Sequence, residues 1–133
     1  MKAKQSGVPF GEALKYLQNA RTILKKAPRQ GSVYTNVKFV QEACGTAYLA
    51  TLKALDEYLL NRGLTRKELP KSFEQYQKAI RKYLSIHNGK LFRQFDYLYD
   101  TLHLAGYYQG LLHQVEIVRE ALNATQSFIE KIK

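Results

Sequence analysis

Apolar residues recur at helical spacing over residues 36–62, and this long segment constrains the fold more than any other feature of the sequence. Asn36 is suited to cap the start of the helix, and Gly63 is suited to end it in a left-handed conformation. One face carries mostly small residues, which let a neighbouring helix approach closely: Val40, Cys44, Ala47, Thr51, Ala54 and Tyr58. The adjoining face carries Tyr48, Leu52, Leu55 and Leu59. A helix that is apolar on two adjacent faces packs against more than one partner, so this segment, about 40 Å long, is predicted to be the centre of a bundle.

Helical spacing continues through the rest of the chain, and no segment shows the pattern of a β-strand. Four further helices are predicted, at about 10–27, 72–87, 90–108 and 112–132. The predicted fold class is therefore all-α, an antiparallel bundle of about five helices. The 133 residues fit one domain, and residues 1–8 are expected to be a flexible basic tail.

Several residues mark the predicted ends of these helices. Pro28 and Gly31 end the first helix, because proline lacks a backbone N–H and glycine lacks a Cβ. Ser72 and Gln75 have the spacing of a capping box at the start of the third helix. Gly106 and Gly110 bracket a predicted turn before the last helix.

The composition restricts the setting in which the chain acts. Its content of 45% apolar and 24% charged residues is ordinary for a globular domain. No apolar run approaches the roughly 20 residues that span a bilayer, and the basic N-terminus is not followed by the apolar stretch of a secretory signal. The single Cys44 cannot form an internal disulfide, which favours an intracellular location. We expect a cytoplasmic protein with no membrane partner.

Positive charge is concentrated in two parts of the chain. Residues 62–93 contain nine Lys or Arg against two Glu, and residues 1–40 contain eight against one, so each part carries +7 while the whole chain carries +10. Such segregation favours a polyanionic partner, either nucleic acid or a nucleotide. The candidate nucleic-acid-binding residues are Arg66, Lys67, Lys71, Lys78, Arg81, Lys82, Lys90 and Arg93. The alternative is a solvated face whose cations only keep the protein in solution.

Arg81 and His87 are separated as R-x5-H, and they are the candidate catalytic pair. Histidine exchanges protons near neutral pH and arginine binds phosphate, so the two suit the cleavage of RNA without a metal. Residues six apart on one helix point about 120° away from each other, so the pair would have to converge through a helix end or across a dimer. In the alternative interpretation His87 completes an apolar stripe and Arg81 is a surface cation.

Two pairs at i, i+3 spacing have residue types that could ligate a metal, Asp100 with His103 and His113 with Glu116. A di-metal helical bundle needs Glu-x-x-His pairs and further carboxylates from other helices, which the chain does not offer in that arrangement. We expect no metal and no cofactor.

Tyrosine is unusually frequent, with ten residues and no tryptophan. Five tyrosines follow the predicted buried stripes: Tyr16, Tyr48, Tyr58, Tyr76 and Tyr83. Tyr97, Tyr107 and Tyr108 do not, and they could form a protein interface, stack on bases, or lie partly buried at a helix end.

Three stretches carry a family resemblance: Ala13–Ala27, Phe39-Val40-Gln41-Glu42-Ala43, and Leu52-Lys53-Ala54-Leu55 leading to Arg62-Gly63. Together they resemble the HEPN family of small helical bundles, whose long Ala-rich helix ends in glycine. Catalytic HEPN proteins carry an R-x4–6-H motif near the last helix and cut RNA as dimers. Here Arg81 and His87 match that spacing but precede the fourth predicted helix, and Lys82 follows the arginine in place of a polar residue. The resemblance therefore implies a non-catalytic bundle that binds a partner and forms a homodimer, with a HEPN-type ribonuclease as the alternative.

Overall fold

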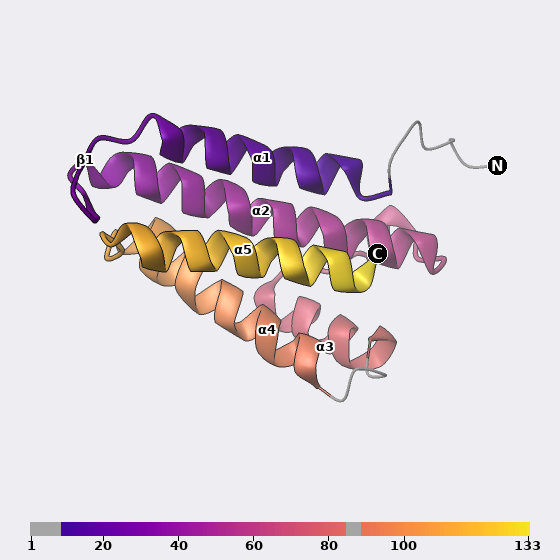
Figure 1. The fold of residues 1–133 in the computed structure, drawn as a ribbon. Helices are drawn as coiled ribbons and strands as arrows, with labels where there is room; N and C mark the ends of the chain where they lie inside the picture. Colours follow the sequence, from indigo (N-terminus) through magenta and orange to yellow (C-terminus); the bar gives the residue numbers. More distant parts are fainter. Residues whose placement is uncertain (1–8, 85–88) are drawn as a thin grey trace.

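Three long helices lie side by side in the computed structural model, which describes residues 9–84 and 89–133 (Figure 1). They are α1 (Gly11–Lys25), α2 (Val37–Asn61) and α5 (Val115–Ile132). Figure 1 shows that α1 runs antiparallel to α2, whereas α5 runs in the same direction as α2. Helix α2 contacts α1, α5 and the later helical segment η3 (Tyr99–Tyr108). The prediction of an all-α bundle is confirmed, with α2 at its centre.

The ends and faces of α2 agree with the sequence prediction. The Asn36 side chain accepts a hydrogen bond from the backbone N–H of Lys38 at 3.1 Å, which is an N-terminal cap. Gly63 has φ +106°, a conformation that side chains disfavour, and it follows the last turn. The small residues Ala43, Ala47 and Ala54 are fully buried, which lets neighbouring helices approach α2 closely.

A second group of helices packs beneath the long ones. It consists of the short 3-10 turn η1 (Arg66–Glu68), α3 (Phe73–Tyr83), α4 (Lys90–Leu98) and the π-helical segment η3, which continues α4 without a break. The sequence predicted one helix over 90–108, and the structure confirms its extent but changes its second half to π-helical pairing. Ser72 caps α3 by accepting from the backbone N–H of Gln75 at 3.2 Å. The predicted return bond is shifted by one residue, because the Gln75 side chain accepts from the N–H of Lys71.

Gly106 does not form the predicted turn. It lies inside η3, where a Cβ would come within 2.6 Å of the Cys44 Sγ on α2. The missing side chain therefore serves a close approach between two helices, and the chain turns instead at Gly110, whose φ is +63°.

A short β-hairpin corrects the expectation that the chain contains no strand. Strands β1 (Arg29–Gln30) and β2 (Val33–Tyr34) pair antiparallel around Gly31, whose φ is +63°. The hairpin also pairs with the segment before α5, since the Tyr34 N–H donates to the His113 carbonyl oxygen at 2.8 Å. Strands of two residues are too short to show alternation in a sequence.

The remaining boundaries differ by a few residues from those predicted. Helix α1 ends at Lys25, before Pro28, and α5 begins at Val115 because the residues before it pair with the hairpin. The predicted tail (1–8) and His87 lie outside the described residues. Among the described helices, none has the length and apolar character needed to cross a membrane.

Candidate nucleic-acid interface

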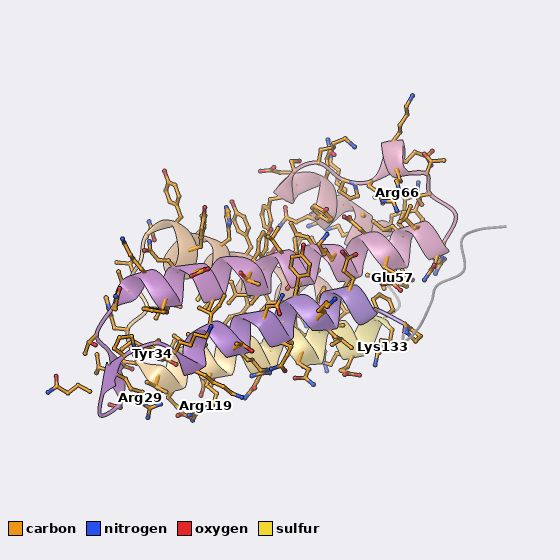
Figure 2. The ribbon with its side chains drawn as sticks, turned by 90° about the horizontal axis from the view of Figure 1, so that it is seen from above. Arg29, Tyr34, Glu57, Arg66, Arg119 and Lys133 are labelled. Carbon is orange, nitrogen blue, oxygen red and sulfur yellow. The ribbon has the colours of Figure 1, made fainter. Side chains whose placement is uncertain are left out.

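The eight cations predicted to bind nucleic acid all have exposed side chains. They lie on three successive elements and the connection between them: Arg66 and Lys67 on η1, Lys71 before α3, Lys78, Arg81 and Lys82 on α3, and Lys90 and Arg93 on α4. We call this group the cationic surface. Figure 2 places Arg66 at the end of the molecule opposite Arg29 and Tyr34. Figure 1 places α3 and the start of α4 at the same end of the bundle.

Carboxylates do not neutralise the cationic surface within residues 9–84 and 89–133. The three ion pairs found there join Lys53 to Glu12, Arg119 to Glu116 and Lys133 to Glu130. None includes one of the eight cations. Their charge is therefore available to an external anion.

Three acids on or beside these elements accept hydrogen bonds from neutral donors, and Glu74 is exposed on α3. Glu68 accepts from the backbone N–H of Thr65 at 2.8 Å, and Asp96 accepts from the Gln77 amide at 2.8 Å. Asp56 accepts from the Tyr76 hydroxyl at 2.8 Å. Burial raises the pKa of the Asp56 carboxyl, although that hydrogen bond and nearby cations, including Arg66, act in the opposite direction.

An open cleft of about 370 Å³ lies between η1 and α3, within the cationic surface. Its lining combines two lysines one helical turn apart with one carboxylate, that of Glu68, and with uncharged side chains: Leu64, Glu68, Pro70, Gln75, Lys78, Ala79, Lys82 and Tyr83. Its volume is at the lower end of the range for small-ligand sites, roughly 300–1,000 Å³. Lys78 and Lys82 can donate to phosphate oxygens there, and the Tyr83 ring offers an apolar surface beside them.

Arg62 and Tyr58 hold the wall of this cleft in place. The Arg62 guanidinium donates to the Tyr58 hydroxyl at 2.8 Å and lies 5.6 Å from the Tyr58 ring centroid and 5.9 Å from that of Tyr83. The Tyr58 hydroxyl in turn donates to the Tyr83 carbonyl oxygen at 3.1 Å. The contacts join the end of α2 to the end of α3.

Arg81, the predicted catalytic arginine, contacts an aromatic ring. Its guanidinium carbon lies 4.3 Å from the ring centroid of Phe92 on α4, a cation–π contact that keeps the side chain on the surface. His87, its predicted partner, lies outside the described residues, so their proximity stays a prediction.

The two described histidines are not arranged as metal ligands. His103 lies between aromatic rings, 5.1 Å from the centroid of Tyr48 and 5.3 Å from that of Tyr99. His113 is exposed beside the hairpin. In the part of the chain that the structure describes, no group of three His, Cys, Asp or Glu could hold a metal ion.

Two features of the site were not recognised in the sequence. Tyr83 was assigned to a buried stripe, yet it is half-buried and lines the cleft. Tyr99, His103 and Tyr107 are spaced four residues apart, and this spacing predicts that the three rings share one face of a helix. Of the three tyrosines singled out, Tyr97, Tyr107 and Tyr108 are 42%, 48% and 74% exposed, so all three lie on the surface.

Comparison with known proteins gives relatives but no activity. No curated protein matches the sequence. A solved structure of a protein of unknown function from Dyadobacter fermentans is similar, with a TM-score of 0.76 and 27% sequence identity over 93% of this chain and 92% of the other. A family described as a domain of unknown function, DUF5618, matches residues 9–133. The chain therefore belongs to the DUF5618 family.

Proposed function

We propose that this protein is a non-catalytic helical module that binds nucleic acid through the cationic surface of η1, α3 and α4. The main supporting observation is that eight exposed cations lie on three consecutive elements and the connection between them. None of the eight pairs with a carboxylate of the described residues. Unpaired cations attract a phosphate backbone and release its counterions, which is the main source of affinity in such complexes.

The cleft supports this proposal because it offers a place for one phosphate. Lys78 and Lys82 line it from the same face of α3, and Gln75 adds an amide. Glu68 lines it from η1, and its carboxylate accepts a hydrogen bond from the Thr65 N–H. A single nucleotide is the alternative ligand, because it offers the same phosphate and base as a nucleic acid. The resemblance to HEPN proteins adds the expectation of a homodimer, which light scattering coupled to gel filtration tests.

Titration of a fluorescein-labelled 16-nucleotide single strand, followed by anisotropy at several salt concentrations, tests the proposal. We expect binding at low salt that weakens steeply as salt rises. The variant Lys78→Glu/Lys82→Glu should bind more weakly, and its log–log salt slope should be smaller by about 1.4, since each phosphate contact on a single strand contributes about 0.7.

Lys25→Glu/Lys26→Glu is the matched control, because it makes the same charge change at exposed positions near the end of α1. It should keep most of the affinity and the slope. If wild-type protein does not bind at low salt, the proposal is wrong. If both double variants lose affinity equally, net charge rather than the cationic surface accounts for binding.

A further inference from the structure

A row of four stacked rings crosses from α3 onto η3. The rings belong to Phe73, Tyr99, His103 and Tyr107, with consecutive centroids 3.8, 5.3 and 5.9 Å apart. Their planes differ by only 18°, 27° and 20° from one ring to the next. We call this row the aromatic ladder.

The spacing of four residues places three of these rings in line on η3. Residues four apart are neighbours on one face of an α-helix, offset by about 40°. A π-helix, with i→i+5 bonding, has more residues per turn, so four residues again come close to one full turn. Tyr99, His103 and Tyr107 therefore share one face of η3. Such π-helical segments are frequently found at functional sites.

The ladder packs against α2 on one side, and its last ring, Tyr107, is exposed. Tyr48 of α2 lies 5.9 Å from Tyr99, and a Cβ on Gly45 would come within 2.8 Å of the Tyr107 ring. Phe73, Tyr99 and His103 are half-buried, whereas Tyr107 and the next residue, Tyr108, are 48% and 74% exposed. Packing of the core does not require an exposed ring at that end.

We infer that the aromatic ladder is the base-stacking element of the nucleic-acid site, so that the ligand is single-stranded. This inference rests on the proposed function. The ladder starts at Phe73, two residues after Lys71 of the cationic surface, so a strand bound there by its phosphates can reach the rings with its bases. At the open end, a bound base stacks on the Tyr107 ring and becomes the fifth ring of the aromatic ladder. In a duplex the base faces are stacked on each other and are not free to do so.

Charge favours a nucleic acid over a second copy of the chain on this face. The chain carries +10, which attracts a phosphate backbone but not an equally charged second copy, so the homodimer expected above would form through another face. Base stacking on aromatic side chains is also tolerant of sequence, because every base has a π-face.

The test compares two ligands that carry the same number of phosphates, a 16-residue oligothymidylate and an abasic strand of equal length. Wild-type protein should bind the oligothymidylate more tightly. Tyr107→Ala should weaken that binding by about 5- to 100-fold, the usual effect of removing one stacking ring, and leave the abasic strand unaffected. Tyr107→Phe should retain the affinity. Tyr97→Ala is the matched control, since Tyr97 is 42% exposed but lies outside the ladder.

A second measurement uses the absence of tryptophan from the chain. Tyr107→Trp places a single fluorophore at the open end, and its emission should be quenched by oligothymidylate but not by the abasic strand. Tyr97→Trp should respond to neither.

The possible results distinguish the stacking inference from the proposed function. Equal binding of both strands, unchanged by Tyr107→Ala, overturns the stacking inference and leaves the proposed function intact. Binding of neither strand at low salt overturns both. If Tyr107→Ala instead halves the mass of the particle and spares binding, the ladder is a contact between two copies and the inference is wrong.

Discussion

The contact between Gly106 and Cys44 offers a quantitative test of the packing between η3 and α2. In Gly106→Ala, the new Cβ would lie 2.6 Å from the Cys44 Sγ, 2.8 Å from its Cβ and 3.0 Å from the Thr101 carbonyl oxygen. Cys44 is fully buried in the middle of α2, so it cannot move aside without shifting the helix. Overpacking of this kind destabilises by about 1–3 kcal/mol, and two atoms of the short, buried Cys44 side chain below 3 Å favour the upper half of that range.

Alanine is also the better helix former, by about 1 kcal/mol over glycine, which offsets part of the loss. We therefore expect the free energy of unfolding of Gly106→Ala to fall by about 1–2 kcal/mol. Urea unfolding followed by far-ultraviolet circular dichroism measures this difference. Adding Cys44→Ala removes the nearest atom, the Sγ, so the double variant should recover part of the loss, seen as a coupling of about 0.5 kcal/mol or more.

Gly45→Ala is the matched control on the other side of the same interface. Its Cβ would meet the Tyr107 ring at 2.8 Å, but that ring is 48% exposed and can swing outward. We expect its stability to stay within about 0.5 kcal/mol of wild type because helix propensity offsets the displacement. The reasoning is refuted if Gly106→Ala is as stable as Gly45→Ala, or if Cys44→Ala gives no recovery.

Three further predictions concern single groups. Burial raises the pKa of the Cys44 thiol to about 12, so a thiol reagent at pH 8 should label the protein in urea but not the native form; rapid native labelling would contradict the described burial. Burial also raises the folded-state pKa of Asp56 above its ordinary 3.8, so stability is lost as the pH rises from 3.8 through the folded value. The free energy of unfolding of Asp56→Asn minus that of wild type should therefore be larger at pH 7 than at pH 3.5. An equal difference at both pH values would show that the Asp56 carboxyl does not contribute. Labelled RNA should remain uncut by wild-type protein, whereas cleavage that His87→Ala abolishes would favour the ribonuclease alternative.

The helices were predictable because their signals are local. The predicted stripe is buried from Val40 through Ala54, since a period of 3.6 residues places it on one face of any helix, and only its last member, Tyr58, is half-buried. The hairpin and the position of the turn were not predictable in this way. The strands of the hairpin are only two residues long, and its pairing with residues 113–115 joins segments far apart in the sequence, so neither leaves a periodic signal. The turn lies at Gly110 because Gly106 is inside η3, packed against Cys44 of α2.

The candidate site was predictable only in its charge. The exposure of all eight cations follows from their place off the apolar stripes, and the sequence gives their order along the chain. The spacing of Tyr99, His103 and Tyr107 predicts a shared helix face, but the stacking of Phe73 on Tyr99 joins two separate helices and leaves no local signal. The turn predicted at Gly106 also hid the continuation of this helix to Tyr108.

The link between the hairpin and residues 113–115 has a consequence for the order in which the chain folds. Helices α1 and α2 are joined by about a dozen residues and can meet early, because closing a short loop loses little entropy. The pairing of Val33 with Gln114 closes a loop of some eighty residues, so it is expected to form late, after most of the intervening chain is compact. Amide exchange at Tyr34 and Val115 should accordingly report the last step of assembly rather than the first.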